Sequence, residues 1–173
     1  MKKEDIQLVP DYYQRYIDLV PDVNLIDALP EGGIKLFTDR MNDLQKLGVK
    51  TYAKGKWTIH EMLEHLMDTE RIFQARALRF ARNDTTELAG YDENAYVKAA
   101  RSNEIPLGKL LMQYIAVRGS TLAMFSNFNK EELMRSGRAN GQEISVLAIG
   151  FILIGHPIHH FKVLEEKYFP LIQ

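Results

Sequence analysis

The sequence contains no cysteine among its 173 residues. A disulfide-stabilised domain, a thiolate metal site and a cysteine nucleophile are therefore excluded. The absence of cysteine also fits a reducing compartment, and we expect a cytoplasmic protein. The N-terminal segment Met1–Asp5 leads directly into polar sequence and lacks the apolar core of a signal peptide.

An excess of either charge is also lacking, because 22 Lys and Arg residues stand against 23 Asp and Glu residues. Proteins that bind DNA or RNA through the phosphates usually present a basic face, so the balance argues against a nucleic-acid partner. The longest apolar run, Val146–Ile154, contains Gly150 and is too short to cross a bilayer. We therefore expect no membrane partner either.

Strand patterns are nearly absent. No sustained alternation of β-branched residues occurs, and the turn at Asn140-Gly141 is flanked by sequence that we interpret as helical. The length and the 46 % apolar content fit one domain, which we expect to span residues 1–173. The sequence thus predicts an all-α fold.

Apolar residues recur at helical spacing in four main stretches. These are Ile34 to Leu47, Ile59 to about Arg82, the stretch after Pro106 to about Phe125, and a last helix that begins after Ser145 and ends before Pro170. Thr58 and Glu61 have the spacing of a capping box, and Ser145 is a good N-cap. Asp92 is expected to cap a further short helix. Four amphipathic helices are most simply buried as an antiparallel bundle.

Three of the five histidines are predicted to face the interior of this bundle. His156 and His160 are four residues apart on the last helix, on the same side as its apolar residues. His65 lies at the edge of the apolar stripe of the second helix. His60 is rotated by about 150° from His65 and is expected to face solvent, and His159 is expected on the flank of the last helix.

Buried imidazoles are costly unless their donor and acceptor are satisfied. A divalent metal ion bound by His65, His156 and His160 would satisfy them and leave a position open for water or substrate. The alternative is that they are core histidines hydrogen-bonded to hydroxyl or carboxylate groups. Sequence spacing alone does not decide between these readings, because it does not show that the two helices are neighbours.

Four segments resemble motifs of the DinB-like superfamily in both order and spacing. They are Trp57–Leu66 with the following Asp68–Arg71, Arg76–Arg82, Gly90–Tyr96, and Gly155–His160. The similarity extends from about Tyr12 to Phe169. The resemblance implies an up-down-down-up four-helix bundle, often a homodimer, with metal ligands that correspond here to His65, His156 and His160.

The resemblance also implies a loosely defined activity. Members of the superfamily include metal-dependent transferases that use low-molecular-weight thiols, and others resemble hydrolases or isomerases. We therefore expect a metal-dependent S-transferase or hydrolase that acts on a small molecule, possesses a zinc, nickel or iron ion, and has Asp68 as a candidate helper in catalysis. The alternative is a non-catalytic bundle that serves as a binding or dimerisation module.

One residue departs from the family pattern. Pro157 follows the first histidine of the last-helix pair, where the family tends to have another residue. Proline removes the N–H that would bond to the Leu153 carbonyl group and its ring crowds that carbonyl, so a kink is expected. Such a kink could re-aim His156 and weaken the predicted site, or it could affect packing only.

Overall fold

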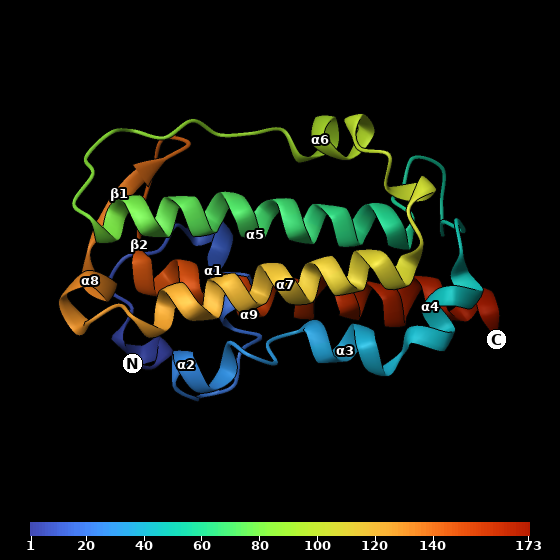
Figure 1. Ribbon diagram of the computed structural model, residues 1–173, viewed down its shortest axis with the longest axis horizontal. Coiled ribbons are helices and arrows are strands. Elements are labelled where there is room, and N and C mark those ends of the chain that lie inside the picture. The colour runs from blue at the N-terminus through green and yellow to red at the C-terminus, as the bar shows by residue number, and fades with distance from the viewer.

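The computed structural model describes residues 1–173 and contains a bundle with four long components. Three are single helices: α5 (Ile59–Ala81), α7 (Leu107–Ser126) and α9 (Val146–Val163). The fourth is a chain of short helices, α2 (Leu25–Ala28), α3 (Ile34–Asp39) and α4 (Met41–Leu47). In Figure 1 this chain and α9 run one way, whereas α5 and α7 run the other way. The predicted up-down-down-up topology is confirmed.

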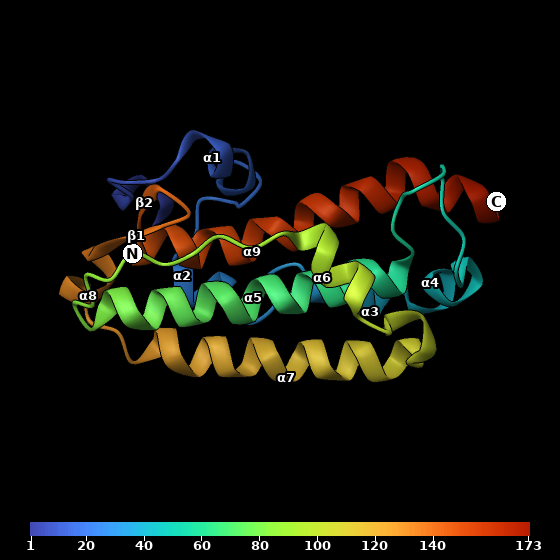
Figure 2. The same cartoon turned by 90° about the horizontal axis from the view of Figure 1, so that it is seen from above.

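The parallel pair α5 and α7 requires a long return connection. The connection runs back along α5 and contains α6 (Glu93–Ala99) and η2 (Ser102–Glu104), as Figure 1 shows. Figure 2 shows α1 (Asp11–Ile17) on the opposite side of α9 from α7. The remaining elements are η1 (Lys3–Asp5), α8 (Lys130–Met134), β1 (Ser136–Ala139), β2 (Gln142–Ser145), η3 (Leu164–Tyr168) and η4 (Phe169–Ile172).

The predicted helix starts are confirmed by their hydrogen bonds. The Glu61 backbone N–H donates to Thr58 Oγ1 over 3.2 Å, and the Thr58 backbone N–H donates to Glu61 Oε2 over 2.7 Å. The Ala148 backbone N–H donates to Ser145 Oγ at the start of α9, and Asp92 caps α6. These caps fix where the two helices that carry the histidines begin.

The helix predicted from Ile34 to Leu47 is interrupted. The backbone of Arg40 leaves the helical region, with φ −109° and ψ 18°, and separates α3 from α4. Its guanidinium group lies over the ring of Phe169 at 4.3 Å and also pairs with Asp43. The break therefore directs a long side chain onto the C-terminal segment.

A small hairpin departs from the all-α prediction. Strands β1 and β2 pair antiparallel, and Asn140 and Gly141 between them both have positive φ, 53° and 72°, as a tight hairpin turn requires. Gly137 lies flat against the ring of Phe80, where an added Cβ would come within 2.1 Å of Phe80 Cδ1. The helical reading of this segment was wrong.

The core is divided into two apolar clusters along the bundle. One contains the C-terminal half of α5 and the start of α9, and the other contains the N-terminal half of α5 together with Phe161 and the C-terminal segment. The segment Val146–Ile172 is long and apolar enough to cross a membrane by length and composition, but it is mostly buried within the bundle. On α9 the two clusters meet at residues 155 to 160, which include His156 and His160.

Candidate metal centre

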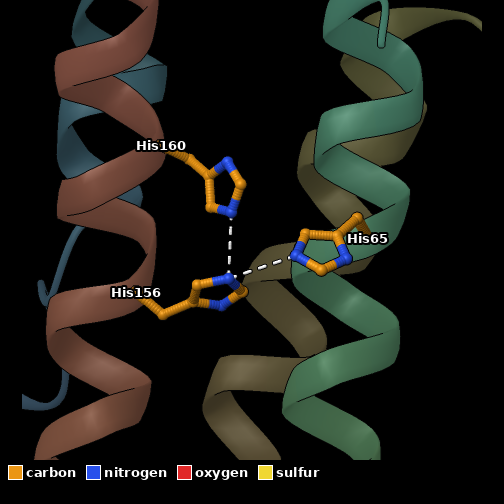
Figure 3. A group of neighbouring side chains, drawn as sticks. All are labelled: His65, His156 and His160. Atoms are coloured by element: carbon orange, nitrogen blue, oxygen red, sulfur yellow. Dashed lines mark hydrogen bonds between the residues drawn. The ribbon is translucent and has the colours of Figure 1, made fainter. Parts of the chain in front are cut away.

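The structure brings His65, His156 and His160 together, as the sequence predicted. His65 projects from α5, and the other two project from successive turns of α9 (Figure 3). His156 Nε2 lies 3.1 Å from His65 Nε2 and 2.9 Å from His160 Nε2. One ligand nitrogen from each residue lies within 4.8 Å of the others. We refer to these three residues as the histidine triad.

The triad is poorly satisfied by its own hydrogen bonds. A neutral imidazole nitrogen carries either one proton or one lone pair. His156 Nε2 therefore cannot donate to both neighbouring Nε2 atoms, and it can only accept from both by sharing one lone pair. A divalent ion at about 2.0–2.1 Å from each nitrogen would place the nitrogens about 2.9–3.4 Å apart. The observed Nε2–Nε2 distances of 2.9 and 3.1 Å fall within this range.

Burial keeps the triad in the neutral form that binds metals. Burial lowers the pKa of His65 from 6.5 to about 4. Burial also holds the pKa of His156 and of His160 well below 6.5, and the neighbouring imidazoles lower both further. All three imidazoles are therefore uncharged near neutral pH, and each keeps one nitrogen lone pair free to bind a metal ion.

The triad borders a cavity of about 750 Å³. The cavity lies between α5, α9, α1 and the connection that carries Tyr91 and Glu93. Its lining includes Asp11, Tyr12, Tyr13, Arg15, Tyr16, Trp57, Thr69, Phe73, Arg76, Asn140, Gln142, Ile152 and His159 in addition to the triad. Apolar, aromatic and charged groups are thus combined in a space large enough for a small-molecule ligand.

Two aromatic rings confine the triad. The Trp57 ring lies 4.6 Å from the His65 ring, and the Tyr16 ring lies edge-on to His156 at 5.1 Å. Tyr16 reaches this position because α1 packs directly on Gly155, where an added Cβ would come within 1.9 Å of the Tyr16 carbonyl oxygen. Gly155 therefore permits the close approach of α1 to α9.

Pro157 does not separate the two histidines of α9. The helix continues from Val146 to Val163 through the proline, and the two imidazoles remain 2.9 Å apart at Nε2. The Leu153 carbonyl oxygen, which loses its usual N–H partner, accepts a hydrogen bond from Arg118 Nη2 over 2.7 Å. A side chain from α7 therefore supplies the donor that Pro157 lacks.

The candidate helper Asp68 is not in the cavity lining. It pairs instead with Arg71, 3.2 Å away on the same helix. His159 lies on the flank of α9, as expected, and borders the cavity. His60 was expected to face solvent but is half-buried, with a buried Nδ1 that has no hydrogen-bond partner. His60 does not take part in the triad.

Several residues of the site were not predicted from the sequence. Tyr16, Trp57 and Arg76 line the cavity, and none of the three was among the predicted site residues. A signal existed for Arg76, because it follows His65 by eleven residues, close to three full helical turns, and Phe73 by three. Trp57 and Tyr16 lie outside the two histidine helices, so helical spacing could not place them.

The comparisons with known proteins agree with this architecture. The sequence model of the DinB superfamily matches residues 26–164. Among solved structures, YfiT from Bacillus subtilis matches with a TM-score of 0.74 at 17 % identity, covering 95 % of this chain and 90 % of that one. YfiT is described as a probable metal-dependent hydrolase with an unusual four-helix bundle topology. No curated protein matches the sequence.

Proposed function

The chain belongs to the DinB superfamily, and from this premise we propose that it is a metal-dependent enzyme that transforms a small molecule at His65, His156 and His160. The observation that carries the proposal is the convergence of three neutral imidazoles on one side of a cavity of about 750 Å³. Core histidines that only stabilised the fold would be expected to have hydroxyl or carboxylate partners, and these three contact one another.

The chemistry proposed for the site is nucleophilic attack by water or by a thiol. A divalent ion held by three imidazoles would lower the pKa of a bound water or thiol and polarise a substrate carbonyl group. The description of YfiT as a probable hydrolase supports the use of water. The resemblance to thiol-dependent transferases supports the use of a low-molecular-weight thiol.

The chain's own residues would orient the substrate and limit access of water. Trp57 and Tyr16 flank the imidazoles, so a reacting group is confined to the side that opens into the cavity. The carboxylates that border this cavity belong to Asp11 and Glu93, on α1 and at the start of α6. Both line the cavity, which Asp68 does not, so they are the carboxylates available to accept a proton from a substrate bound there.

Metal content provides the first test. Protein purified without a histidine tag and loaded with Zn²⁺, Ni²⁺ or Fe²⁺ should retain about one equivalent after gel filtration, and His160→Ala should retain none. His60→Ala is the matched control, because His60 lies on the same helix as His65 but outside the triad. Wild-type protein that stays metal-free with all three ions would rule out the proposal.

Turnover provides the second test. The loaded protein should hydrolyse members of an ester and amide panel, or conjugate a low-molecular-weight thiol to an electrophile, and His160→Ala should do neither. The non-catalytic alternative predicts that loss of the triad changes stability or association without any turnover to lose. A metal-loaded wild type that is inactive on both panels would favour that alternative.

The homodimer, the cytoplasmic location and a single domain over residues 1–173 remain predictions. Met112 and Ile115 on α7 are exposed, 66 % and 42 %, and lie on the same helix. They mark the part of the surface that a second copy would cover if the chain dimerises through α7. Sedimentation of wild type and Met112→Glu would test that arrangement.

A further inference from the structure

Arg76 is a buried arginine without an acidic partner. Its side chain is 6 % exposed, and no carboxylate lies within 4.0 Å of its guanidinium group. The other buried arginine of α5 and α7, Arg118, forms an ion pair with Glu70. Buried charged side chains are almost always paired, so an unpaired one indicates a missing partner.

Protein contacts account for only part of the Arg76 guanidinium group. Nη2 donates a hydrogen bond to the Ala89 carbonyl oxygen over 3.0 Å, and the group lies 5.1 Å from the centre of the Phe73 ring. A guanidinium has five N–H donors in a planar fork. The bond to Ala89 explains how Arg76 helps to hold the connection between α5 and α6. The Tyr13 hydroxyl also lies close enough to interact with the guanidinium group, but no carboxylate accepts from the fork.

The remaining part of the fork faces the cavity of the histidine triad. His65, Thr69, Phe73 and Arg76 follow one another on α5 at spacings of four, four and three, and all four line the cavity. Eleven residues of helix correspond to a rise of about 16 Å. The cavity is therefore long, with the triad towards the N-terminal end of α5 and Arg76 nearer to the hairpin β1–β2, which Figure 1 shows at the opposite end of the helix.

We infer that Arg76 binds a carboxylate group of an elongated substrate whose reacting end lies at the histidine triad. The inference rests on the proposed function for the position of the reacting end. A carboxylate matches the planar fork in a two-bond geometry and supplies the single negative charge that a buried guanidinium needs.

The surroundings favour a carboxylate over a more highly charged group such as a phosphate. Only one other cationic side chain borders the cavity, Arg15, and it is stacked over Tyr12 and donates a hydrogen bond to Tyr16 Oη. Asp11 and Glu93 border the same cavity and oppose a second negative charge. The apolar wall between the two ends, with Phe73 and Ile152, fits an aliphatic or aromatic spacer.

A thiol acid of variable length tests both ends of the cavity. Cobalt-loaded wild type is titrated with mercaptopropionate, mercaptooctanoate and mercaptoundecanoate and with the matching mercapto alcohols, and binding is followed through the thiolate-to-cobalt charge-transfer absorption. The longer acids should bind about tenfold or more tightly than their alcohols. Mercaptopropionate should show no such preference, because it cannot span the distance to Arg76.

Two variants test whether Arg76 causes the preference for the acids over the alcohols. Arg76→Gln should reduce the acid-to-alcohol ratio of the longer probes to about threefold or less. Arg79→Gln is the matched control: Arg79 lies on the same helix and pairs with Asp84 outside the cavity, so the ratio should be unchanged. Should Arg76→Gln fail to fold, the dependence on probe length in wild type still decides the matter.

Three results would overturn the inference: no preference for the acids in wild type, a preference that survives in folded Arg76→Gln, or one that is largest for mercaptopropionate, which would point to Arg15. Failure of wild type to bind cobalt would contradict the proposed function alone. The Arg76 site is then tested in metal-free protein by equilibrium dialysis of octanoate against octanol. Equal binding of the two would overturn it.

Discussion

Arg118 and His156 are both almost fully buried in the same bundle, yet their polar groups are satisfied in opposite ways. Arg118 donates through Nε and Nη2 to the two carboxylate oxygens of Glu70, at 2.7 and 2.8 Å. Its other bonds go to the carbonyl oxygens of Leu29, Gly32 and Leu153. All five N–H donors of the guanidinium are thereby used. Glu70 also accepts a hydrogen bond from the Thr121 hydroxyl, and we refer to Arg118, Glu70 and Thr121 as the arginine cluster.

The histidine triad differs because its hydrogen bonds run only among its own Nε2 atoms and its open side faces a cavity. The arginine cluster is complete within the protein and can act only on the fold. The triad and the neighbouring Arg76 are incomplete without a ligand. A buried polar group therefore indicates a binding site only when the protein itself does not supply all of its hydrogen-bond partners.

The largest effect is expected from breaking the arginine cluster. Arg118→Met should lower the free energy of unfolding by about 3–5 kcal/mol, because it leaves the Glu70 carboxylate buried and uncompensated. Urea denaturation of the metal-free protein measures this loss. The double variant Arg118→Met, Glu70→Leu should recover part of the lost free energy of unfolding, because the uncompensated carboxylate is then removed as well. A single variant as stable as wild type would show that the cluster does not hold the bundle together.

The second effect is a dependence of the free energy of unfolding on pH, which the histidine triad causes. Since the folded-state pKa of His65, about 4, lies below its unfolded value of about 6.5, the stability it contributes is complete above pH 6.5 and is lost as the pH falls towards 4. The loss should reach about 3 kcal/mol for His65, and His156 and His160 act in the same direction. Urea midpoints of metal-free protein across this range measure it, and His65→Phe should flatten the dependence.

A smaller effect is expected from removing one bond of the arginine cluster. Thr121 Oγ1 donates to Glu70 Oε1 over 2.7 Å, and Thr121→Val keeps the shape of the side chain while deleting the donor. The free energy of unfolding should fall by about 1–2 kcal/mol, with metal binding unchanged. Thermal unfolding measures the loss of stability, and metal analysis of the same preparation measures metal binding. A loss of metal would mean that the two clusters are coupled.

The smallest effect is expected from His65→Phe at neutral pH. In metal-free protein the free energy of unfolding should change by less than about 1 kcal/mol, because the imidazole forms only one hydrogen-bond contact and a phenyl ring would stay against Trp57. Zn²⁺ at about 100 times its dissociation constant should stabilise wild type by about 2.7 kcal/mol and leave the variant unchanged. A large loss without metal would make the triad a structural cluster like that of Arg118.

The parts of this structure that were predictable are those set by local pattern. Helical periodicity and the caps at Thr58 and Ser145 predicted both ends of α5 and the start of α9, although α9 ends at Val163 and not just before Pro170. The rotation per residue placed His65, His156 and His160 inside the bundle. The proximity of the two helices came from the family resemblance, because periodicity gives the direction of a side chain but not its neighbour.

The parts that were not predictable depend on partners distant in sequence. Arg118 on α7 is buried, although the sequence presents it as an ordinary charged side chain. The strand Ser136–Ala139 has no β-branched residue, and its form depends on the contact of Gly137 with Phe80. Such contacts are absent from any local window of the sequence.

The bond from Arg118 to Leu153 has a mechanical consequence for the last helix. A proline normally creates a flexible joint, since one rung of the backbone ladder is missing on the side of the ring. Here that rung is replaced by a guanidinium anchored to Glu70, and the Pro157 ring packs against Gly33, where no Cβ would fit. These two contacts hold the helical turns before and after Pro157 in place. The fold itself therefore sets the 2.9 Å separation between the Nε2 atoms of His156 and His160, without help from a ligand.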